Sequence, residues 1–100
     1  MALETPTIKQ LEYFVRLAES STFRSAAEQL KISQPTLTAQ IYNLEKTLNL
    51  TLIERSRSGA TLTPAGRDLL ANARQVLEEM NGLLDQAAMI NHGPGGIFRM

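Results

Sequence analysis

The hydrophobic positions near the N-terminus recur with the period of an α-helix. Thr7, followed three residues later by Gln10, has the spacing of a capping box, in which the hydroxyl accepts from a free amide and the glutamine side chain reaches back. We therefore expect a helix that begins here and ends near Ser20. Its core-facing positions follow the i, i+3, i+4 and i+7 spacing and are Ile8, Leu11, Phe14, Val15 and Ala18.

A second, short helix is expected directly afterwards. Ser21 or Thr22 can cap it, because short hydroxyl side chains accept from the first free amides of a helix. Small residues on its inner side would permit close contact with neighbouring helices. The expected buried positions are Phe23, Ala26, Ala27 and Leu30.

The connection at 31–32 is very short, and Ser33 with Pro35 in the first turn predicts the start of a third helix. Two helices joined so tightly cross at a steep angle. Stepped at 100° per residue, the inward positions are Leu37, Ile41, Leu44 and Leu48. The outward positions are Pro35, Ala39, Tyr42, Asn43 and Lys46, flanked by Thr36 and Thr38.

After the third helix the pattern changes to that of a two-stranded hairpin. Residues 51–55 have strand-like character, and residues 56–60 have the composition of a turn. Residues 61–63 are expected to form the second strand of the hairpin. The arginines at the tip are expected to be exposed. The expected anchors to the core are Leu52 or Ile53 together with Leu62.

A long helix is predicted next, because Thr63 and Pro64 form a strong start signal and the helical pattern continues to about Ile90. Its apolar positions alternate in steps of four and three, as in a coiled coil. At 1.5 Å per residue this seam is roughly 30 Å long, too long for a three-helix core to cover, so much of it must contact another chain or domain. The expected dimer interface is Leu69, Ala73, Val76, Leu77, Met80, Leu83, Leu84 and Ala87.

These elements together predict a mainly α fold, a winged helix-turn-helix of three helices and a two-stranded β-wing, followed by a long dimerisation helix. The expected divisions are a winged helix-turn-helix domain at residues 1–62 and a linker and dimerisation helix at 63–92. Residues 93–100, which begin with Gly-Pro-Gly-Gly, are expected to form a hinge and the start of a larger domain.

Composition excludes several classes of site. The 100 residues include no cysteine and a single histidine, so disulfides, thiolate metal sites and imidazole pairs are excluded, and we expect no metal and no cofactor. The N-terminus has no signal-peptide pattern, and no apolar run is long enough for a membrane span, which predicts a cytoplasmic protein. Ten basic against ten acidic residues give no net charge, whereas nucleic-acid binders usually carry a basic excess.

Two segments resemble a known family. LEYFVRLAESSTFRSAAEQLKISQPTLTAQIYNLEKTLNLTLIERS and TLTPAGRDLL are similar to the N-terminal DNA-binding domain of LysR-type transcriptional regulators, over residues 7–90. The resemblance implies a bacterial regulator that binds double-stranded DNA as a dimer or tetramer on an interrupted palindrome. It also implies a larger effector-binding domain, through which alone a small-molecule effector would act, after the hinge.

The resemblance places the third helix in the major groove and the wing along the minor groove or its backbone. Short hydroxyls, an amide and small apolar groups suit base edges, and phosphate contacts would supply most of the affinity. Many relatives carry arginine at the position of Ala39 and a basic residue near Tyr42, which this sequence lacks. The expected DNA-contacting residues are Arg24, Ser33, Gln34, Pro35, Thr36, Thr38, Ala39, Gln40, Asn43, Arg55 and Arg57.

Two other functions remain as alternatives. A protein-interaction module, which would use the winged domain for binding and the long helix for oligomerisation, fits the zero net charge best. An enzyme is remote, because Ser33 has no cysteine or histidine to pair with and the chain has no glycine-rich phosphate loop. Salt dependence distinguishes DNA binding from the protein-interaction module, since DNA binding weakens steeply as the salt concentration rises.

Overall fold

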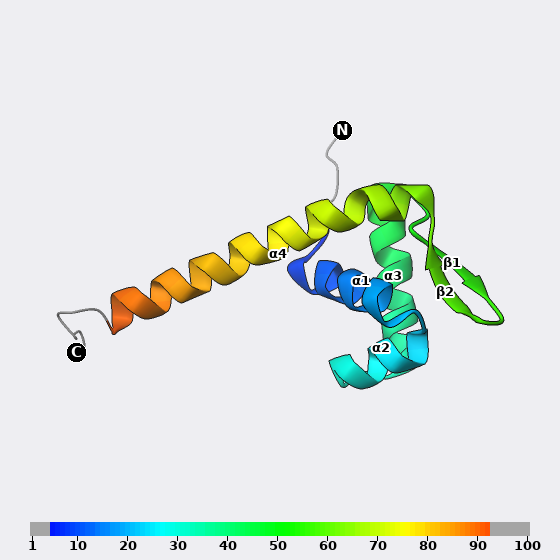
Figure 1. Cartoon of the computed structure of the whole chain (residues 1–100), viewed down its shortest axis with the longest axis horizontal. Helices are drawn as coiled ribbons and strands as arrows, with labels where there is room; N and C mark the ends of the chain where they lie inside the picture. Colours follow the sequence, from blue (N-terminus) through cyan, green and yellow to red (C-terminus); the bar gives the residue numbers. More distant parts are fainter. Residues whose placement is uncertain (1–4, 93–100) are drawn as a thin grey trace.

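The structure is a computed structural model that describes residues 5–92 of the chain. Its elements are, in order, α1 (Ile8–Ser20), α2 (Phe23–Leu30), α3 (Gln34–Leu48), β1 (Ile53–Ser56), β2 (Gly59–Leu62) and α4 (Pro64–Asn91). Helices α1 to α3 form one body, the β1–β2 hairpin stands at its side, and α4 runs away from it (Figure 1). The predicted winged helix-turn-helix with a long last helix is confirmed. The hinge expected at residues 93–100 lies outside the described residues.

The predicted starts of the first two helices are confirmed by their caps. The Thr7 hydroxyl accepts from the Gln10 amide at 3.0 Å, and Gln10 Oε1 accepts from the Thr7 amide at 3.1 Å, which completes the capping box. Thr22 accepts from the Ser25 amide at 3.0 Å and therefore caps α2. Ser21, the other candidate, ends α1 instead.

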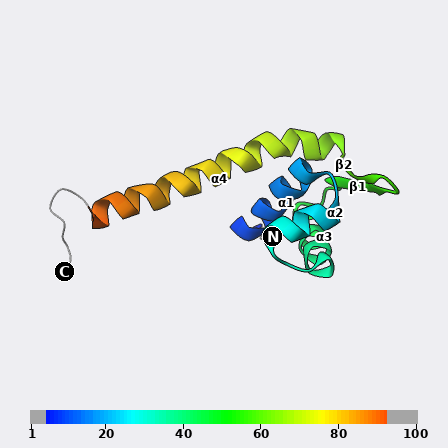
Figure 2. The ribbon, with the colours of Figure 1, turned by 60° about the horizontal axis from the view of Figure 1, so that its bottom comes forward.

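Each of the first three helices ends at a non-glycine residue in the left-handed conformation. The φ angles are 68° at Ser21, 61° at Lys31 and 56° at Asn49. This conformation costs an L-residue roughly 1–2 kcal/mol, but it turns the chain within one residue. It accounts for the short connections and for the steep arrangement of α1, α2 and α3 in the ribbon (Figure 2).

The core lies where α1 contacts α2, α3 and α4. Its largest fully buried side chains are Phe14, Leu17, Leu37, Leu44 and Leu52. The sequence pattern missed Leu17, because a single amphipathic stripe assumes that a helix packs on one side only. Since α1 lies among three helices, a wider arc of its surface is buried.

The wing is a tighter hairpin than the sequence predicted. Arg55 pairs with Ala60 and Ser56 with Gly59, so the turn comprises only residues 57–58. The assignment of Ala60 to the turn was wrong: it lies in β2, is 7% exposed, and its amide donates to the Ser21 carbonyl at 2.8 Å. The wing is thereby attached to the turn between α1 and α2.

Helix α4 begins at a buried cap and ends far from the body. The Thr63 hydroxyl accepts from the Gly66 amide at 2.9 Å and donates to the Thr51 carbonyl at 2.6 Å. Arg74 Nη2 lies 3.2 Å from Glu19 Oε2 and joins α4 to α1. From residue 81 to residue 92 every position is exposed, and in both ribbon views this part of α4 extends away from the other elements (Figures 1 and 2).

None of the helices within residues 5–92 has both the length and the hydrophobicity that a bilayer crossing requires.

Candidate nucleic-acid interface

The outward surface of α3 consists of small and polar side chains. Leu37, Ile41 and Leu44 are buried against the body, as their spacing predicted. The five positions predicted to face outward, Pro35, Ala39, Tyr42, Asn43 and Lys46, are all exposed. Nothing bulky or acidic stands on the first two turns of this face, which leaves a smooth helical ridge.

The N-terminus of α3 presents polar groups at one end of that ridge. Ser33 Oγ accepts from the Thr36 amide at 3.2 Å and donates to Thr36 Oγ1 at 2.8 Å. Gln34, the first residue of α3, is exposed next to them. The positive end of the helix dipole and these hydroxyl groups together favour an anionic partner.

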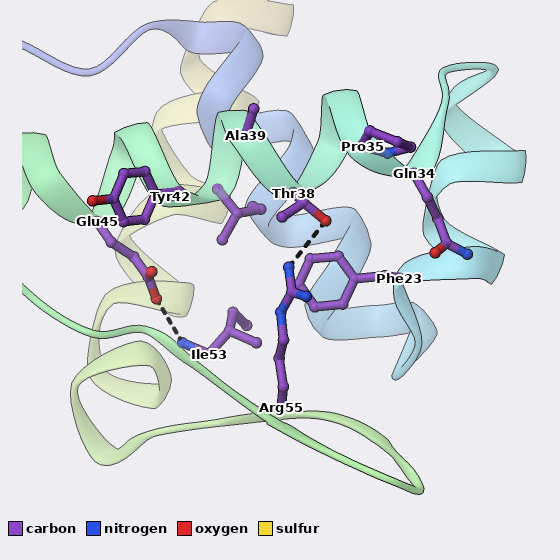
Figure 3. A pocket seen from close by; sticks show the side chains of 10 residues that line it. Phe23, Gln34, Pro35, Thr38, Ala39, Tyr42, Glu45, Ile53 and Arg55 are labelled. Carbon is purple, nitrogen blue, oxygen red and sulfur yellow. Dashed lines mark hydrogen bonds between the residues drawn. The ribbon is translucent and has the colours of Figure 1, made fainter.

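A groove separates α3 from the wing. Its volume is about 580 Å³, and Figure 3 shows the side chains that line it. Glu45 lies on its α3 side, where Oε2 accepts from the Leu52 amide at 2.8 Å and from the Ile53 amide at 3.1 Å. These two bonds satisfy the carboxylate and fix the entry to β1. The lining residues are Phe23, Gln34, Pro35, Thr38, Ala39, Ile41, Tyr42, Glu45, Ile53 and Arg55.

Arg55 spans the groove instead of standing at the wing tip. It lies within β1, and its guanidinium carbon is 4.1 Å from the centre of the Phe23 ring. Nη2 donates to Thr38 Oγ1 at 2.9 Å (Figure 3). Both wing arginines are exposed as predicted, but only Arg57 occupies the turn at the tip, whereas Arg55 lies within β1.

The other predicted contact residues surround this groove without lining it. Arg24, on α2, forms an exposed ion pair with Glu28 at 3.6 Å. Gln40 is half-buried and its Oε1 accepts from Gln10 Nε2 at 3.4 Å, so it faces α1. Asn43 is exposed farther along α3. The structure thus gathers Gln34, Pro35, Thr38, Ala39 and Arg55 at one groove.

Sequence reasoning did not assign Phe23, Tyr42, Glu45 and Ile53 to this site. Ile53 could have been found from the alternation of strand side chains, since it lies two residues before the predicted Arg55 and shares a face of β1 with it. Glu45 could not, because its role depends on backbone amides brought close by the chain reversal after Asn49.

The apolar seam of α4 divides into two parts. Ala73 is 6% exposed and belongs to the core, and Leu69 packs against that core. Farther along, Leu83 and Leu84 are 60% and 55% exposed, and Ile90 is 71% exposed. The first two residues of the predicted interface are therefore engaged within the chain. Val76 is 38% exposed, Leu77 and Met80 are half-buried, and the fully exposed part of the seam begins at Leu83.

The sequence of residues 8–67 matches the family described as bacterial regulatory helix-turn-helix protein, lysR family. The match runs from the first residue of α1 into the first turn of α4 and includes every side chain of the groove. The chain belongs to the LysR family. It carries the DNA-binding domain of a LysR-family transcriptional regulator, and the resemblance seen in the sequence is confirmed.

The LysR-family relatives are regulators of transcription. The HTH-type transcriptional regulator TfdS of Cupriavidus pinatubonensis is 43% identical over 88 residues, which are 88% of this chain and 30% of TfdS. The oxidized form of OxyR from Corynebacterium glutamicum superimposes with a TM-score of 0.85 at 40% identity, over 90% of this chain and 28% of OxyR. The chain thus spans less than a third of the length of these proteins.

Solved relatives include complexes with DNA. In a crystal structure of a complex between the CbnR DNA-binding domain and DNA, the protein superimposes on this chain with a TM-score of 0.80 at 38% identity. The superposition covers 84% of this chain and 97% of the CbnR domain. The LysR-family winged helix-turn-helix therefore extends over nearly all of the described residues.

Proposed function

We propose that this LysR-family chain binds a specific sequence of double-stranded DNA, with α3 in the major groove and the wing against the neighbouring minor groove or its backbone. The observation that carries the proposal is the exposed ridge of α3 beside the groove and the wing. A major groove about 12 Å wide admits one α-helix with its side chains. The likeness to the CbnR domain, whose solved complex contains DNA, supports this assignment.

Gln34 is the residue that we propose for direct base recognition. Its amide has a donor and an acceptor, which match N7 and N6 of adenine in the major groove. Pro35, Thr36, Thr38 and Ala39 offer methyl or ring carbons to thymine methyl groups, and the two threonines add hydroxyls. The absence of long side chains on this part of α3 lets the helix axis approach the bases closely.

Phosphate contacts supply the remaining affinity in this proposal. Arg24 can reach a phosphate, because its exposed ion pair with Glu28 is weak in water. Ser33 and the α3 N-terminus suit a phosphate oxygen, as do Gln40 and Asn43 along the helix and Arg57 in the wing turn. These contacts are few for each chain, so one copy alone binds weakly.

We propose that two copies pair through the seam of α4 to bind two half-sites. The free apolar residues from Val76 onward would be covered by the α4 of the second copy. An apolar groove of about 170 Å³ at the base of the seam, between α1, α3 and α4, extends this surface. A symmetric pair presents two copies of α3, which suits an interrupted palindrome with half-sites about one helical turn apart.

The proposal extends to the organisation of a longer protein of which this chain would be one part. Residues 1–62 serve as the DNA-binding part and residues 63–92 as the linker helix. The relatives are about three times longer than this chain, so a small-molecule effector would act through a further domain, and tetramers would form in the complete protein. Binding to chromosomal DNA, without any catalysis, places this protein in the bacterial cytoplasm.

Substitution of Gln34 tests base recognition. Duplexes selected from a random pool would define the preferred sequence, and fluorescence anisotropy would compare it with a scrambled duplex. Gln34→Ala should reduce the preference by roughly 5- to 150-fold, since a bidentate base contact contributes about 1–3 kcal/mol of discrimination. Gln75→Ala, on the exposed side of α4, is the matched control. An equal loss on both duplexes would refute base recognition by Gln34.

A salt titration separates DNA binding from the protein-interaction module, which the zero net charge favours. The logarithm of the DNA affinity should fall linearly with the logarithm of the salt concentration, with a slope of about −0.9 per phosphate contacted. A chain with no preference among duplexes and no dependence on salt would be the interaction module instead.

A further inference from the structure

Three elements meet at the guanidinium of Arg55. The arginine comes from β1, the ring beneath it from Phe23 at the start of α2, and the hydroxyl that it bonds from Thr38 in α3. Figure 3 shows the three side chains together at the edge of the groove. The stack at 4.1 Å and the hydrogen bond at 2.9 Å use the two properties in which arginine differs from lysine, a planar face and a fork of donors.

The hydrogen bond constrains Thr38. A guanidinium has donors only, so the threonine oxygen must be the acceptor of this bond. Because a β-branched side chain has few χ1 conformations, directing Oγ1 toward the wing also fixes the direction of the methyl group. Thr38 is half-buried on the α3 side of the groove, next to Ala39 and Pro35. Its methyl group is therefore held in one orientation beside the surface that faces DNA, and its hydroxyl hydrogen is directed away from the guanidinium.

We propose that Arg55 is a positioning residue for sequence recognition, which acts through Thr38 and is not primarily a phosphate contact. This inference rests on the proposed function and adds a specific coupling to it. Arg55 sets the orientation in which Thr38 meets a base edge, and Phe23 holds Arg55 in place. The wing thereby contributes to the reading of the major groove, although it lies outside it.

Lysine at position 55 separates the two roles. It keeps the positive charge that a phosphate contact needs, but it lacks the planar face and the fork. Arg55→Lys should keep the salt slope and the affinity for scrambled DNA within about twofold of the unmodified chain. It should lose roughly fivefold of the preference at one base-pair position, as expected for one hydrogen bond of about 1 kcal/mol.

Thr38→Val, which removes the hydroxyl and keeps the shape, should lose preference at that same base pair. The double variant Arg55→Lys/Thr38→Val should then show the same loss of preference as Thr38→Val alone, because Arg55 acts only through this hydroxyl. Thr38→Ser keeps the acceptor and should preserve the dependence on Arg55. Arg67→Lys, at an exposed position in the first turn of α4, is the control and should change neither the preference nor the salt slope. Arg57→Gln, in the wing turn, should weaken all duplexes equally and reduce the salt slope.

The outcomes distinguish this inference from the proposed function. Additive losses in the double variant, or an Arg55→Lys chain with full preference, would overturn the coupling and leave DNA recognition by α3 intact. A uniform loss on all duplexes with a reduced salt slope in Arg55→Gln, without a change in preference, would make Arg55 a phosphate contact. If the unmodified chain prefers no duplex, both proposals fail together. Thermal unfolding of each variant checks that the fold is retained.

Discussion

The apolar side chains of the helical body are buried, whereas those on the outer part of α4 are exposed. In the body, Phe14 and Leu37 are 1% and 0% exposed, whereas Leu83 and Ile90 on α4 are 60% and 71% exposed. Both regions have regular helical patterns of apolar residues. The difference shows that the body buries its apolar residues within one chain, whereas the outer part of α4 leaves them exposed, which supports our proposal that a second copy covers them.

The first and the last turns of α4 show the same difference in burial within one helix. Its first turns are fixed by Thr63 and Gly66 and by the buried Ala73, and its last turns contact no other element. Stability of the fold should therefore depend on the first part, and association between chains should depend on the second. Four substitutions test this division.

The largest effect on folding is expected in the body. Leu37→Ala should lower the free energy of unfolding by about 2–5 kcal/mol, because it leaves a cavity in the fully buried core. Leu83→Ala, the matched change on α4, should alter it by less than about 0.5 kcal/mol in dilute, monomeric protein. Urea unfolding followed by circular dichroism measures both. Equal losses would mean that the outer part of α4 folds back on the body.

The largest effect on association is expected in the outer part of α4. Leu83→Asp should weaken pairing by about 3 kcal/mol or more, roughly 100-fold in affinity, because a carboxylate would be buried in the seam. Sedimentation equilibrium measures the change in mass. Glu79→Asp, which keeps an acidic side chain at an exposed position one helical turn earlier, serves as the control and should leave the mass unchanged. An unaltered dimer in Leu83→Asp would place the interface elsewhere.

Close packing at the start of α4 gives the next effect. A Cβ at Gly66 would lie 2.2 Å from the Leu52 carbonyl oxygen, and a backbone atom cannot move aside easily. Gly66→Ala should therefore destabilise the fold by about 1–3 kcal/mol. The measurement is the urea midpoint at constant slope. An unfolding midpoint equal to that of the unmodified chain would contradict the close approach of α4 to residue 52.

The smallest effect has the opposite sign. A Cβ at Gly82 would meet no atom within 4 Å, so only the helix propensity changes. Gly82→Ala should stabilise α4 by about 1 kcal/mol, since alanine restricts the unfolded chain more than glycine does. A rise in helical circular dichroism and in melting temperature would support this. A loss of stability would show that Gly82 makes a close contact with a second chain.

The element order and most boundaries follow from local signals in the sequence. Thr7, Ser33 and Thr63 cap their helices as predicted, because capping depends on residues three positions apart. The inward and outward faces of α3 are also correct. The exposed ridge of α3 was therefore predictable, and the family resemblance strengthened the prediction.

The remaining features depend on contacts between segments distant in the sequence. Leu17 is buried because α1 lies among α2, α3 and α4, and Ala60 is buried because its strand meets Ser21. The sequence predicted only that Arg55 is an arginine of the wing. Its contacts with Phe23 and Thr38 depend on how α2, α3 and β1 come together in the fold. Local spacing carries no information on such pairs.

The hydroxyl of Thr63 joins the segment that leads into β1 to the start of α4, since it donates to the Thr51 carbonyl and accepts from the Gly66 amide. A helix of 28 residues is about 42 Å long, so a tilt of about 10° at this joint would carry its far end through about 7 Å. Any change of angle at Thr63 would thus be amplified along the length of α4. Small rotations there would translate into large changes in the distance between two recognition helices, and so into the spacing of the operator halves that a pair of chains can span.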